Sequence, residues 1–479
     1  MTDSFARGLI AGTKAIANVA RTGSLKPRVG AIGDSRLHHD VANYTVVTGS
    51  LPYINDTAVP AAGKVAGKTT RGIMTWFEAQ SFGQVECHIY DTQTVSAGQV
   101  SWSPMDNQAI GGSVTAALSY HVDRILAQAT KPTHVVIMSG YNNAGLYGIF
   151  SDSDANAVLV NAKTDQISAW QRLLNAGIQP IIFIDPPADF AGNAFRVKYH
   201  QALRQWQRLN AEKYGCWMID MADSAADVAS SVGAPLSAQY APESPMVHPG
   251  PQFCQLAGAR LVSLFTSKGL VSLPHYNQSR QDTYDSVVNI AGNLISNGGL
   301  MLGTTGTFNG SNPPTGQAPT NWACRNNTSG GGTGTIVSSV QARAAGKGQG
   351  QDWKIVVTAT TDLEVWCYID LGSTTAIGDI VSGSIEVNVD SSVNLDRLNV
   401  YLAEMDPGLT TEQQECGMML GGAAASYGLL PTSFSIRPYS EKMQLSSTGG
   451  KVRLMVKVYV TAGGSLTMRL GAAAVRKFI

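Results

Sequence analysis

Patterns typical of strands and of helices take turns along the chain from Arg28 to about residue 273. The run from His134 to Met138 is typical of a buried strand, and residues 114–127 carry apolar side chains at the three- and four-residue spacing of a helix. Strands and helices that alternate in this way form a parallel sheet with helices on both faces. The sequence therefore predicts an α/β fold for this stretch.

The other elements of the α/β stretch follow from the same two patterns. Further strands are expected at residues 29–32, 85–90, 180–184 and 216–219, and further helices at residues 162–176, 195–209 and 253–265.

The helical patterns stop near residue 273, and the chain that follows is rich in Gly, Ser and Thr. Residues 385–390 and 452–460 alternate strictly between apolar and other side chains, as half-buried strands do. Many short strands without helices predict an all-β jelly roll or sandwich. Further strands are expected at residues 353–358, 363–371, 398–402, 433–436 and 466–470. We therefore expect an N-terminal arm at 1–27, an α/β domain at 28–275 and a β-sandwich domain at 276–479.

Charge and cysteine content argue against several kinds of partner and site. The 479 residues include 34 basic and 34 acidic side chains, so no net field attracts nucleic acid. We expect no membrane insertion, because no apolar run approaches the length of a spanning helix. The six cysteines are scattered without a Cys-x-x-Cys pair. This predicts free, mostly buried thiols rather than a zinc or thioredoxin-type site, and leaves disulfides open.

The first 27 residues lack the pattern of a secretory signal peptide, because the start is acidic and residues 8–20 are interrupted by polar side chains. Two interpretations of this arm stay open: a terminal helix, or a segment that attaches the protein to others.

The sequence Gly33-Asp34-Ser35 directly follows the first expected strand. A serine at the carboxyl end of a parallel strand lies where open α/β sheets bind their ligands. Three other stretches are expected at the same edge: Gly98 and Asn142, which follow the next two strands, and His248, which precedes the last helix. A hydroxyl, an imidazole and an amide that meet there would suit nucleophilic catalysis.

In the same order along the chain, these blocks resemble those of the SGNH hydrolases, also called GDSL-type esterases, over roughly residues 28–270. The resemblance implies a flavodoxin-like three-layer α/β/α fold. It implies Ser35 as the nucleophile and His248 as the base. It also implies an oxyanion hole made by the backbone N–H groups of Ser35 and Gly98 and the side-chain amide of Asn142. Fixed donors of this kind each contribute several kcal/mol to transition-state stabilisation.

The sequence departs from the family pattern at the acid that orients the histidine. The family usually has Asp three residues before the His, where this chain has Pro245. Glu243 is the substitute we expect, with Asp220 and Asp223 as rivals. A Ser-His dyad supported by a backbone carbonyl is a further alternative.

Two more positions near the expected site leave questions open. Gly111 and Gly112 compete with Gly98 for the role of oxyanion glycine. Asn143 stands where the family often has Asp, which should alter packing near the site more than its chemistry.

Two other motifs are similar to a phosphate-binding loop and to a metal site, but we expect neither ligand to bind there. Residues 62–69 approximate a phosphate-binding loop, but the turn-like residues before them do not form the required buried strand. His38, His39 and Asp40 suggest a metal site, but adjacent histidines on an extended chain face opposite ways. We therefore expect neither a cofactor nor a bound metal.

Together these features predict a serine esterase that removes acyl groups, most plausibly O-acetyl groups, from a polysaccharide. The β-sandwich resembles carbohydrate-binding jelly rolls. Five of its aromatic residues are expected either to stack on sugar rings or to lie in the core, and for Trp366 we favour the core. These residues are Trp322, Trp353, Trp366, Tyr368 and Tyr401.

The architecture resembles phage tail proteins that deacetylate bacterial surface polysaccharide. It suggests a virion tail or extracellular location, other tail proteins as partners through the arm, and a homo-oligomer. The alternative is a catalytically inactive carbohydrate-binding adhesin or receptor-binding protein.

Overall fold

The computed structural model describes most of the chain from residue 26 to residue 478. The described residues are 26–38, 72–87, 90–96, 99–104, 109–110, 112–128, 130–190, 192–227, 236–242, 247–272, 282–310, 312–326, 332–343, 350–371, 375–410, 412–421, 428–440, 443–445 and 451–478. The expected arm lies outside them except for residues 26 and 27, and so do the phosphate-loop-like segment 62–69, His39 and Asp40. Among the described residues, no helix is both long and apolar enough to cross a membrane.

Five parallel strands form the central sheet of the α/β part in the order β2-β1-β5-β6-β7. They are β1 (Arg28–Gly33), β2 (Glu86–Cys87), β5 (His134–Met138), β6 (Gln179–Phe183) and β7 (Trp217–Ile219). Counted among themselves, these strands run 2-1-3-4-5, which is the flavodoxin-like order. In that order the strand connections change direction between β1 and β5, so a ligand site is expected outside the carboxyl ends of these two strands.

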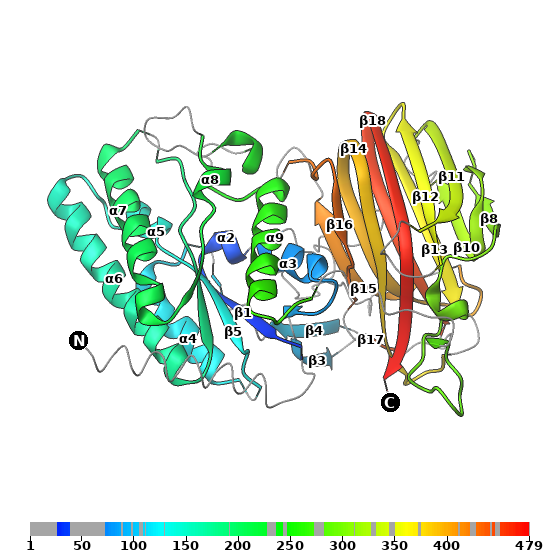
Figure 1. Ribbon diagram of the computed structural model, residues 1–479, viewed down its shortest axis with the longest axis horizontal. Coiled ribbons are helices and arrows are strands. Elements are labelled where there is room, and N and C mark those ends of the chain that lie inside the picture. Colours follow the sequence, from blue (N-terminus) through cyan, green and yellow to red (C-terminus); the bar gives the residue numbers. More distant parts are fainter. Residues whose placement is uncertain are drawn as a thin grey trace.

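Helices cover both faces of this sheet (Figure 1). They are α2 (Ser35–His38), α3 (Ile73–Gln80), α4 (Leu118–Leu126), α5 (Tyr141–Leu146), α6 (Asp152–Asn175), α7 (Ala194–Asn210), α8 (Ala222–Ala225) and α9 (Pro251–Ser267), with short 3-10 turns at Thr115–Ala117, Glu212–Tyr214, Ser237–Gln239 and Ser296–Gly299. A separate two-stranded antiparallel sheet joins β3 (Tyr90–Ser96) to β4 (Gln99–Pro104).

The two faces of the sheet belong to different cores because strand side chains alternate between faces. On β1, Ile32 packs with α4 and α6, whereas Val29 and Ala31 pack with α3 and α9. Trp170 of α6 is fully buried in the first of these cores. The arrangement is the three-layer α/β/α fold that the sequence predicts, and it confirms the predicted fold class for this part.

Eleven strands form the second sheet, which makes up the β-rich part. They are β8 (Thr305–Asn309), β9 (Thr315–Gly316), β10 (Ala318–Asn326), β11 (Gly334–Ala342), β12 (Gln351–Ala359), β13 (Leu363–Leu371), β14 (Ile380–Met405), β15 (Glu412–Gly421), β16 (Phe434–Ile436), β17 (Met443–Gln444) and β18 (Lys451–Phe478).

Two long antiparallel strands, β14 and β18, connect the two layers of this β-sandwich (Figure 1). Residues 452–460 of β18 pair with β13, whereas residues 465–470 pair with β12. The change of neighbour falls at a corner where Gly463 has φ +71° and Asn394 has φ +57°. The Asn394 side chain donates to the Ala462 carbonyl at 3.3 Å across this corner. The sequence analysis treats 385–390 and 398–402 as separate strands, but both belong to β14.

The aromatic residues considered as sugar platforms are buried in two separate clusters of the β-rich part. Trp322 and Trp353 lie in the main core, whereas Trp366, Tyr368 and Tyr401 lie in a smaller cluster on the other face of β13. Trp322 and Trp353 meet edge to face across the two layers, with ring centroids 6.0 Å apart. None of the five is more than 9% exposed. Trp366 lies between two cations, the Arg325 guanidinium at 3.9 Å and the Lys457 ammonium at 4.0 Å from its ring centroid. The structure therefore decides for the core interpretation and against sugar stacking, because buried rings offer no face to a ligand.

The α/β part and the β-rich part share one continuous hydrophobic core at α3. Trp76 of α3 packs edge to face on Phe434 of β16, with centroids 5.1 Å apart. The Arg437 backbone N–H donates to the Ala79 carbonyl at 2.8 Å, and the Tyr439 hydroxyl donates to the Phe82 carbonyl at 3.0 Å. These contacts join the two parts through backbone as well as side chains.

Candidate active site

The end of β1 requires glycine before the expected nucleophile. Gly33 has φ +142°, and a Cβ at this position would lie 1.8 Å from the Met138 carbonyl oxygen of β5. Any larger side chain would push the two strands apart. Asp34 then turns the chain away from the sheet, with its backbone N–H donating to the same carbonyl at 3.2 Å. Ser35 therefore begins the single helical turn α2 directly beyond the sheet edge.

Ser35 and His248 lie within hydrogen-bonding distance, although 213 positions separate them in the sequence. The Ser35 Oγ and the His248 Nε2 are 3.0 Å apart. Both side chains are partly buried, so the pair is sheltered without being closed off from a substrate. A serine hydroxyl at this distance from an imidazole nitrogen can pass its proton to the ring as it attacks.

Backbone hydrogen bonds hold His248 in position before α9. The His248 carbonyl accepts from the Ala241 N–H at 2.9 Å, and the Gly250 N–H donates to the Gln239 carbonyl at 2.9 Å. Pro251 then starts the helix at a position where the missing N–H is not needed. The imidazole is thus carried by a short antiparallel pairing rather than by a loose loop.

A fully buried charge cluster lies next to Ser35 in the sequence. Arg36 donates to Asp34 from Nε at 3.0 Å and from Nη2 at 2.6 Å, and the same Nη2 donates to Asp185 at 2.6 Å. Asp185 also meets the His200 Nε2 at 3.0 Å. Because Asp34 and Asp185 follow β1 and β6, the guanidinium links the two sheet-edge turns around the candidate site.

Burial alone would favour the neutral forms of Asp185 and Arg36, but the attraction between their opposite charges keeps both ionised. Burial opposes ionisation of Asp185, yet the Arg36 charge and the His200 hydrogen bond hold the pKa of its carboxyl below the usual range. Burial also opposes the Arg36 charge, yet Asp185 and Asp34 raise the pKa of the guanidinium. Burial lowers the pKa of His200, although the hydrogen bond and the charge of Asp185 act to raise it. Arg36 therefore stays charged between two carboxylates.

Asn142 lies at the start of α5, just beyond the end of β5. Because Gly33 of β1 pairs with Met138 of β5, Ser35 and Asn142 both follow this paired position closely. The Asn142 Nδ2 donates to the Ser113 carbonyl at 3.0 Å, which uses one of its two hydrogens. The other hydrogen can serve a ligand.

The neighbouring Asn143 has a structural role. It is 1% exposed, accepts from the Thr115 N–H at 2.9 Å and donates to the Thr115 Oγ1 at 2.8 Å. These contacts agree with the expectation that this departure from the family pattern affects packing.

The segment that contains Gly112 crosses the same sheet edge. The Ile110 N–H donates to the Gly33 carbonyl at 3.1 Å, and Ser113 accepts from Asn142. Gly112 lies between these two contacts and has φ +76°. Gly98 and Gly111 lie outside the described residues, and the residues that flank Gly98 pair within the separate β3–β4 sheet.

Arginines bind both rival carboxylates. Asp220 accepts from Arg208 at 2.5 Å and 3.2 Å, and Asp223 accepts from Arg260 at 2.6 Å. The hydrogen bonds from Arg208 help to hold the pKa of Asp220 below its usual range despite burial. Glu243 and Pro245 lie outside the described residues.

Arg36, Asp185 and His200 lie around Ser35 but were not predicted from the sequence. Asp185 carried a usable signal, because it follows a buried strand just as Asp34 does. Arg36 and His200 carried no usable sequence signal, since an arginine after a serine and a histidine within a helix are usually solvent-facing or structural. The metal interpretation of His38, His39 and Asp40 stays untested, because His39 and Asp40 lie outside the described residues. Among the described residues, no group of three or more His, Cys, Asp or Glu side chains could hold a metal ion.

Comparisons with known proteins give similar structures rather than similar sequences. No family model and no curated protein matches the chain. A lipolytic protein of the G-D-S-L family from Desulfitobacterium hafniense is similar over 50% of this chain and 99% of its own, with 14% identity and a TM-score of 0.31.

Two other similar structures are of a carbohydrate-binding module and of a phage protein. A structure of carbohydrate-binding modules from the β-sandwich superfamily is similar over 32% of this chain and 56% of its own, with 14% identity and a TM-score of 0.25. The enzymatically active domain of a bacteriophage CBA120 tailspike protein is similar over 33% of this chain and 20% of its own, with 8% identity and a TM-score of 0.23. Because these scores are low, the function proposed below rests on the geometry of the site.

Proposed function

We propose that this protein is a carboxylic ester hydrolase in which Ser35 is the nucleophile and His248 the general base. The observation that carries the proposal is the 3.0 Å separation between the Ser35 Oγ and the His248 Nε2. A free serine hydroxyl is a weak nucleophile, and an imidazole in contact with it supplies the base it needs. Gly33, α2 and the strand-like pairing before α9 support this geometry from both sides.

The reaction follows the acyl-enzyme scheme. The Ser35 Oγ attacks the ester carbonyl while its proton moves to the His248 Nε2, which gives a tetrahedral oxyanion and an imidazolium. The imidazolium then gives the proton to the departing alcohol oxygen as the C–O bond breaks. A water molecule, deprotonated by His248, attacks the acyl-enzyme, and Ser35 recovers its proton when the carboxylic acid leaves.

Three groups are proposed as donors to the oxyanion. The Ser35 N–H opens a helical turn, where the first N–H groups have no partner within the helix. The Asn142 amide has a second hydrogen, and the glycine N–H is assigned to Gly98 or, from its place at the sheet edge, to Gly112. Loss of one such donor costs about 10²- to 10³-fold in kcat. Asn142→Ala should therefore lose about that factor.

The direct test is hydrolysis of p-nitrophenyl acetate by the full chain and by Ser35→Ala. We expect the variant to lose roughly 10³-fold or more of kcat/KM with an unchanged melting temperature, because the nucleophile is lost and packing is not. Ser267→Ala is the matched control, because this exposed serine at the end of α9 donates its hydroxyl hydrogen to the Leu264 carbonyl of its own helix. Equal and negligible rates for wild type and Ser35→Ala would contradict the proposal and favour the alternative of an inactive binding protein.

A covalent probe gives a readout that is independent of turnover. A fluorophosphonate should label the wild type on Ser35, as peptide mass spectrometry would show, and should not label Ser35→Ala. The His248→Asn variant should react far more slowly, since an unassisted hydroxyl is a poor nucleophile.

We propose Glu243 as the carboxylate that orients His248. Glu243→Gln should then lower kcat by roughly 10²- to 10⁴-fold. Asp220→Asn and Asp223→Asn should leave the rate nearly unchanged, because arginines already bind both carboxylates. An unchanged rate in Glu243→Gln would instead favour the Ser-His dyad supported by a backbone carbonyl.

For the substrate we propose an O-acetylated polysaccharide, met at a virion tail or another extracellular surface. The support for this substrate is that one continuous hydrophobic core joins an esterase-like α/β part to a β-sandwich. Acetate release from acetylated xylan and from acetylated bacterial capsule would test it, with the chemically deacetylated polymers as controls. Hydrolysis of the small chromogenic ester without release from any polymer would contradict the polysaccharide assignment alone.

A further inference from the structure

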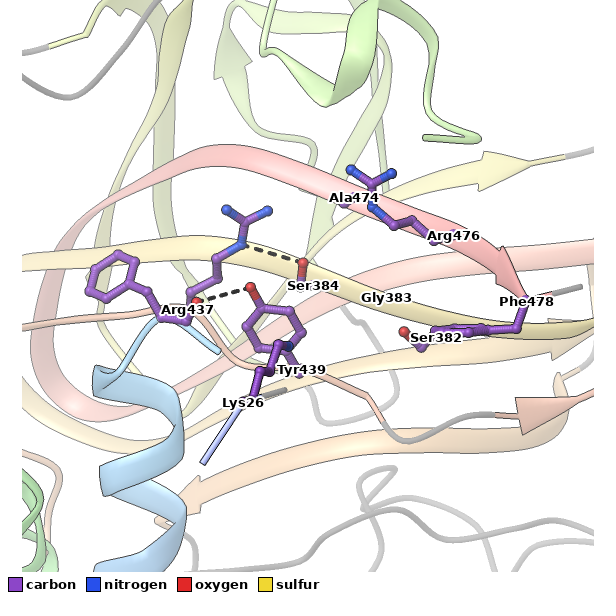
Figure 2. A pocket seen from close by; sticks show the side chains of 10 residues that line it. Lys26, Ser382, Gly383, Ser384, Arg437, Tyr439, Ala474, Arg476 and Phe478 are labelled. Carbon is purple, nitrogen blue, oxygen red and sulfur yellow. Dashed lines mark hydrogen bonds between the residues drawn. The ribbon is translucent and has the colours of Figure 1, made fainter. Parts of the chain in front are cut away.

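A cavity of about 380 Å³ lies between the α/β part and the β-rich part, away from Ser35 (Figure 2). Its walls combine the segments around Lys26 and Phe82 with residues of β14, of β18 and of the stretch after β16. Figure 2 shows Arg437, Tyr439 and Lys26 grouped at one side of this cavity. The volume falls in the range of small-ligand sites.

The cavity wall carries more positive than negative charge. Lys26, Arg437 and Arg476 line it, and no acidic residue does so among the described residues. Asp282 already neutralises Arg476, through a contact of 2.5 Å. Within the described part of the chain, neither Lys26 nor Arg437 forms an ion pair, so two cations remain without a counter-charge.

Arg437 is the unusual member of this group, because it is only 8% exposed. Its side chain makes a single long hydrogen bond, from Nε to the Ser384 Oγ at 3.4 Å, within the described part of the chain. The terminal guanidinium nitrogens Nη1 and Nη2 therefore have no hydrogen-bond acceptor there. These two nitrogens are not among the fully buried polar atoms that lack a partner, so they are accessible to a ligand.

Both cations lie beside the ring of Tyr439. The Arg437 guanidinium lies 5.8 Å and the Lys26 ammonium 5.3 Å from the centroid of this ring. The Tyr439 hydroxyl donates to the Phe82 carbonyl at 3.0 Å, and the ring packs so closely on Gly83 that a Cβ there would lie 2.2 Å from it. The ring is thus fixed across the junction, with both cations beside it.

We propose that this junction cavity binds the oxyanion group of a small polar ligand, such as the carboxylate of an acidic sugar or a phosphate. The two terminal nitrogens of Arg437 match the two oxygens of such a group in a bidentate pair. Lys26 adds a second charge from the solvent side. Ser384 and Tyr439 supply further polar and aromatic surface for the rest of the ligand.

The site is separate from Ser35, so binding is measured without reference to esterase activity. Isothermal titration of the full chain at low ionic strength would compare glucuronate with glucose and with inorganic phosphate. We expect glucuronate, phosphate or both to bind, and glucose to give no heat, because only the anions neutralise Arg437 and Lys26. The glucuronate and phosphate arms distinguish a sugar acid from a phosphate.

Two variants link the binding to the proposed residues. Arg437→Gln removes the guanidinium but keeps the backbone bond to Ala79, and it should weaken binding roughly 10- to 100-fold, as loss of a charge-assisted pair does. Lys26→Gln changes an exposed side chain that cannot affect folding strongly, and it should weaken binding several-fold. Lys268→Gln is the matched control, because this exposed lysine also lies 5.3 Å from an aromatic centroid but lines no part of the cavity.

Three results would each overturn the proposal. They are no binding of either anion by the wild type, equal binding of glucose, and unchanged binding in both Lys26→Gln and Arg437→Gln. If Arg437→Gln fails to fold, Lys26→Gln against Lys268→Gln still decides the question. Loss of activity in Ser35→Ala with normal anion binding would leave this site intact.

Discussion

Two buried arginines, one in each part of the molecule, have opposite surroundings. Arg36 beside Ser35 is 1% exposed and lies between the carboxylates of Asp34 and Asp185. Arg437 after β16 is 8% exposed and has no carboxylate partner within the described residues. A charge that is matched inside the protein stabilises the fold that surrounds it, whereas an unmatched one costs stability unless a ligand completes it. The comparison therefore separates a structural arginine from one available for binding.

The largest effect on stability is expected from Arg36→Met. This change leaves Asp34 and Asp185 buried without their cation, and breaking a buried pair in this way costs about 3–5 kcal/mol. Urea unfolding would measure the loss. The control is Arg172→Met, whose partner Asp123 is exposed, and it should cost about 1 kcal/mol or less. A loss as small as the control's would show that the matched charges around Ser35 contribute nothing to stability.

The second prediction concerns His134 and a dependence of stability on pH that arises in the α/β part. All eight histidines precede residue 276, so none lies in the β-rich part that begins with β8. Burial of His134 against Trp217 and Phe265 lowers its pKa from 6.5 to about 3. Between these values the unfolded chain binds a proton that the folded chain does not, so stability falls as the pH falls.

The expected slope for His134 is about 1.4 kcal/mol per pH unit between pH 6.5 and about 3. His134→Gln keeps an acceptor near the Thr133 hydroxyl and removes the titrating imidazole. The stability of the variant should therefore fall less steeply than that of the wild type as the pH is lowered. Urea unfolding midpoints at half-unit pH steps would measure both slopes. Parallel curves for wild type and variant would contradict the prediction.

The smallest effect is expected from Arg437→Gln in buffer without a multivalent anion or a sugar acid. Loss of packing is offset by the removal of a cation that has no carboxylate partner among the described residues, so the free energy of unfolding should change by less than about 1 kcal/mol. Thermal and urea unfolding would check this. A loss comparable to that of Arg36→Met would mean that Arg437 is structural, and the comparison between the two arginines would fail.

Local patterns in the sequence were enough for most of the α/β part. β5 has its predicted bounds, residues 134–138, and β6 and α7 lie within one or two residues of theirs. Ser35 and His248 could be singled out as candidates because one follows an expected strand and the other precedes an expected helix, and the ends of parallel strands share one edge of the sheet. A helix such as α3 was missed because all eight of its residues are buried, and a helix buried all round has no apolar stripe to detect.

The sequence by itself determined the order of strands and helices, the change to an all-β part, and which polar residues follow the strand ends, because these depend on periodicity and chain neighbours. Only the tertiary structure decided that β14 and β18 each continue around a corner, that the five aromatic rings of the β-rich part are buried, and that Arg36 has carboxylate partners while Arg437 has none among the described residues. Burial and charge pairing depend on residues far apart in the chain. No local pattern records whether a side chain will meet its partner.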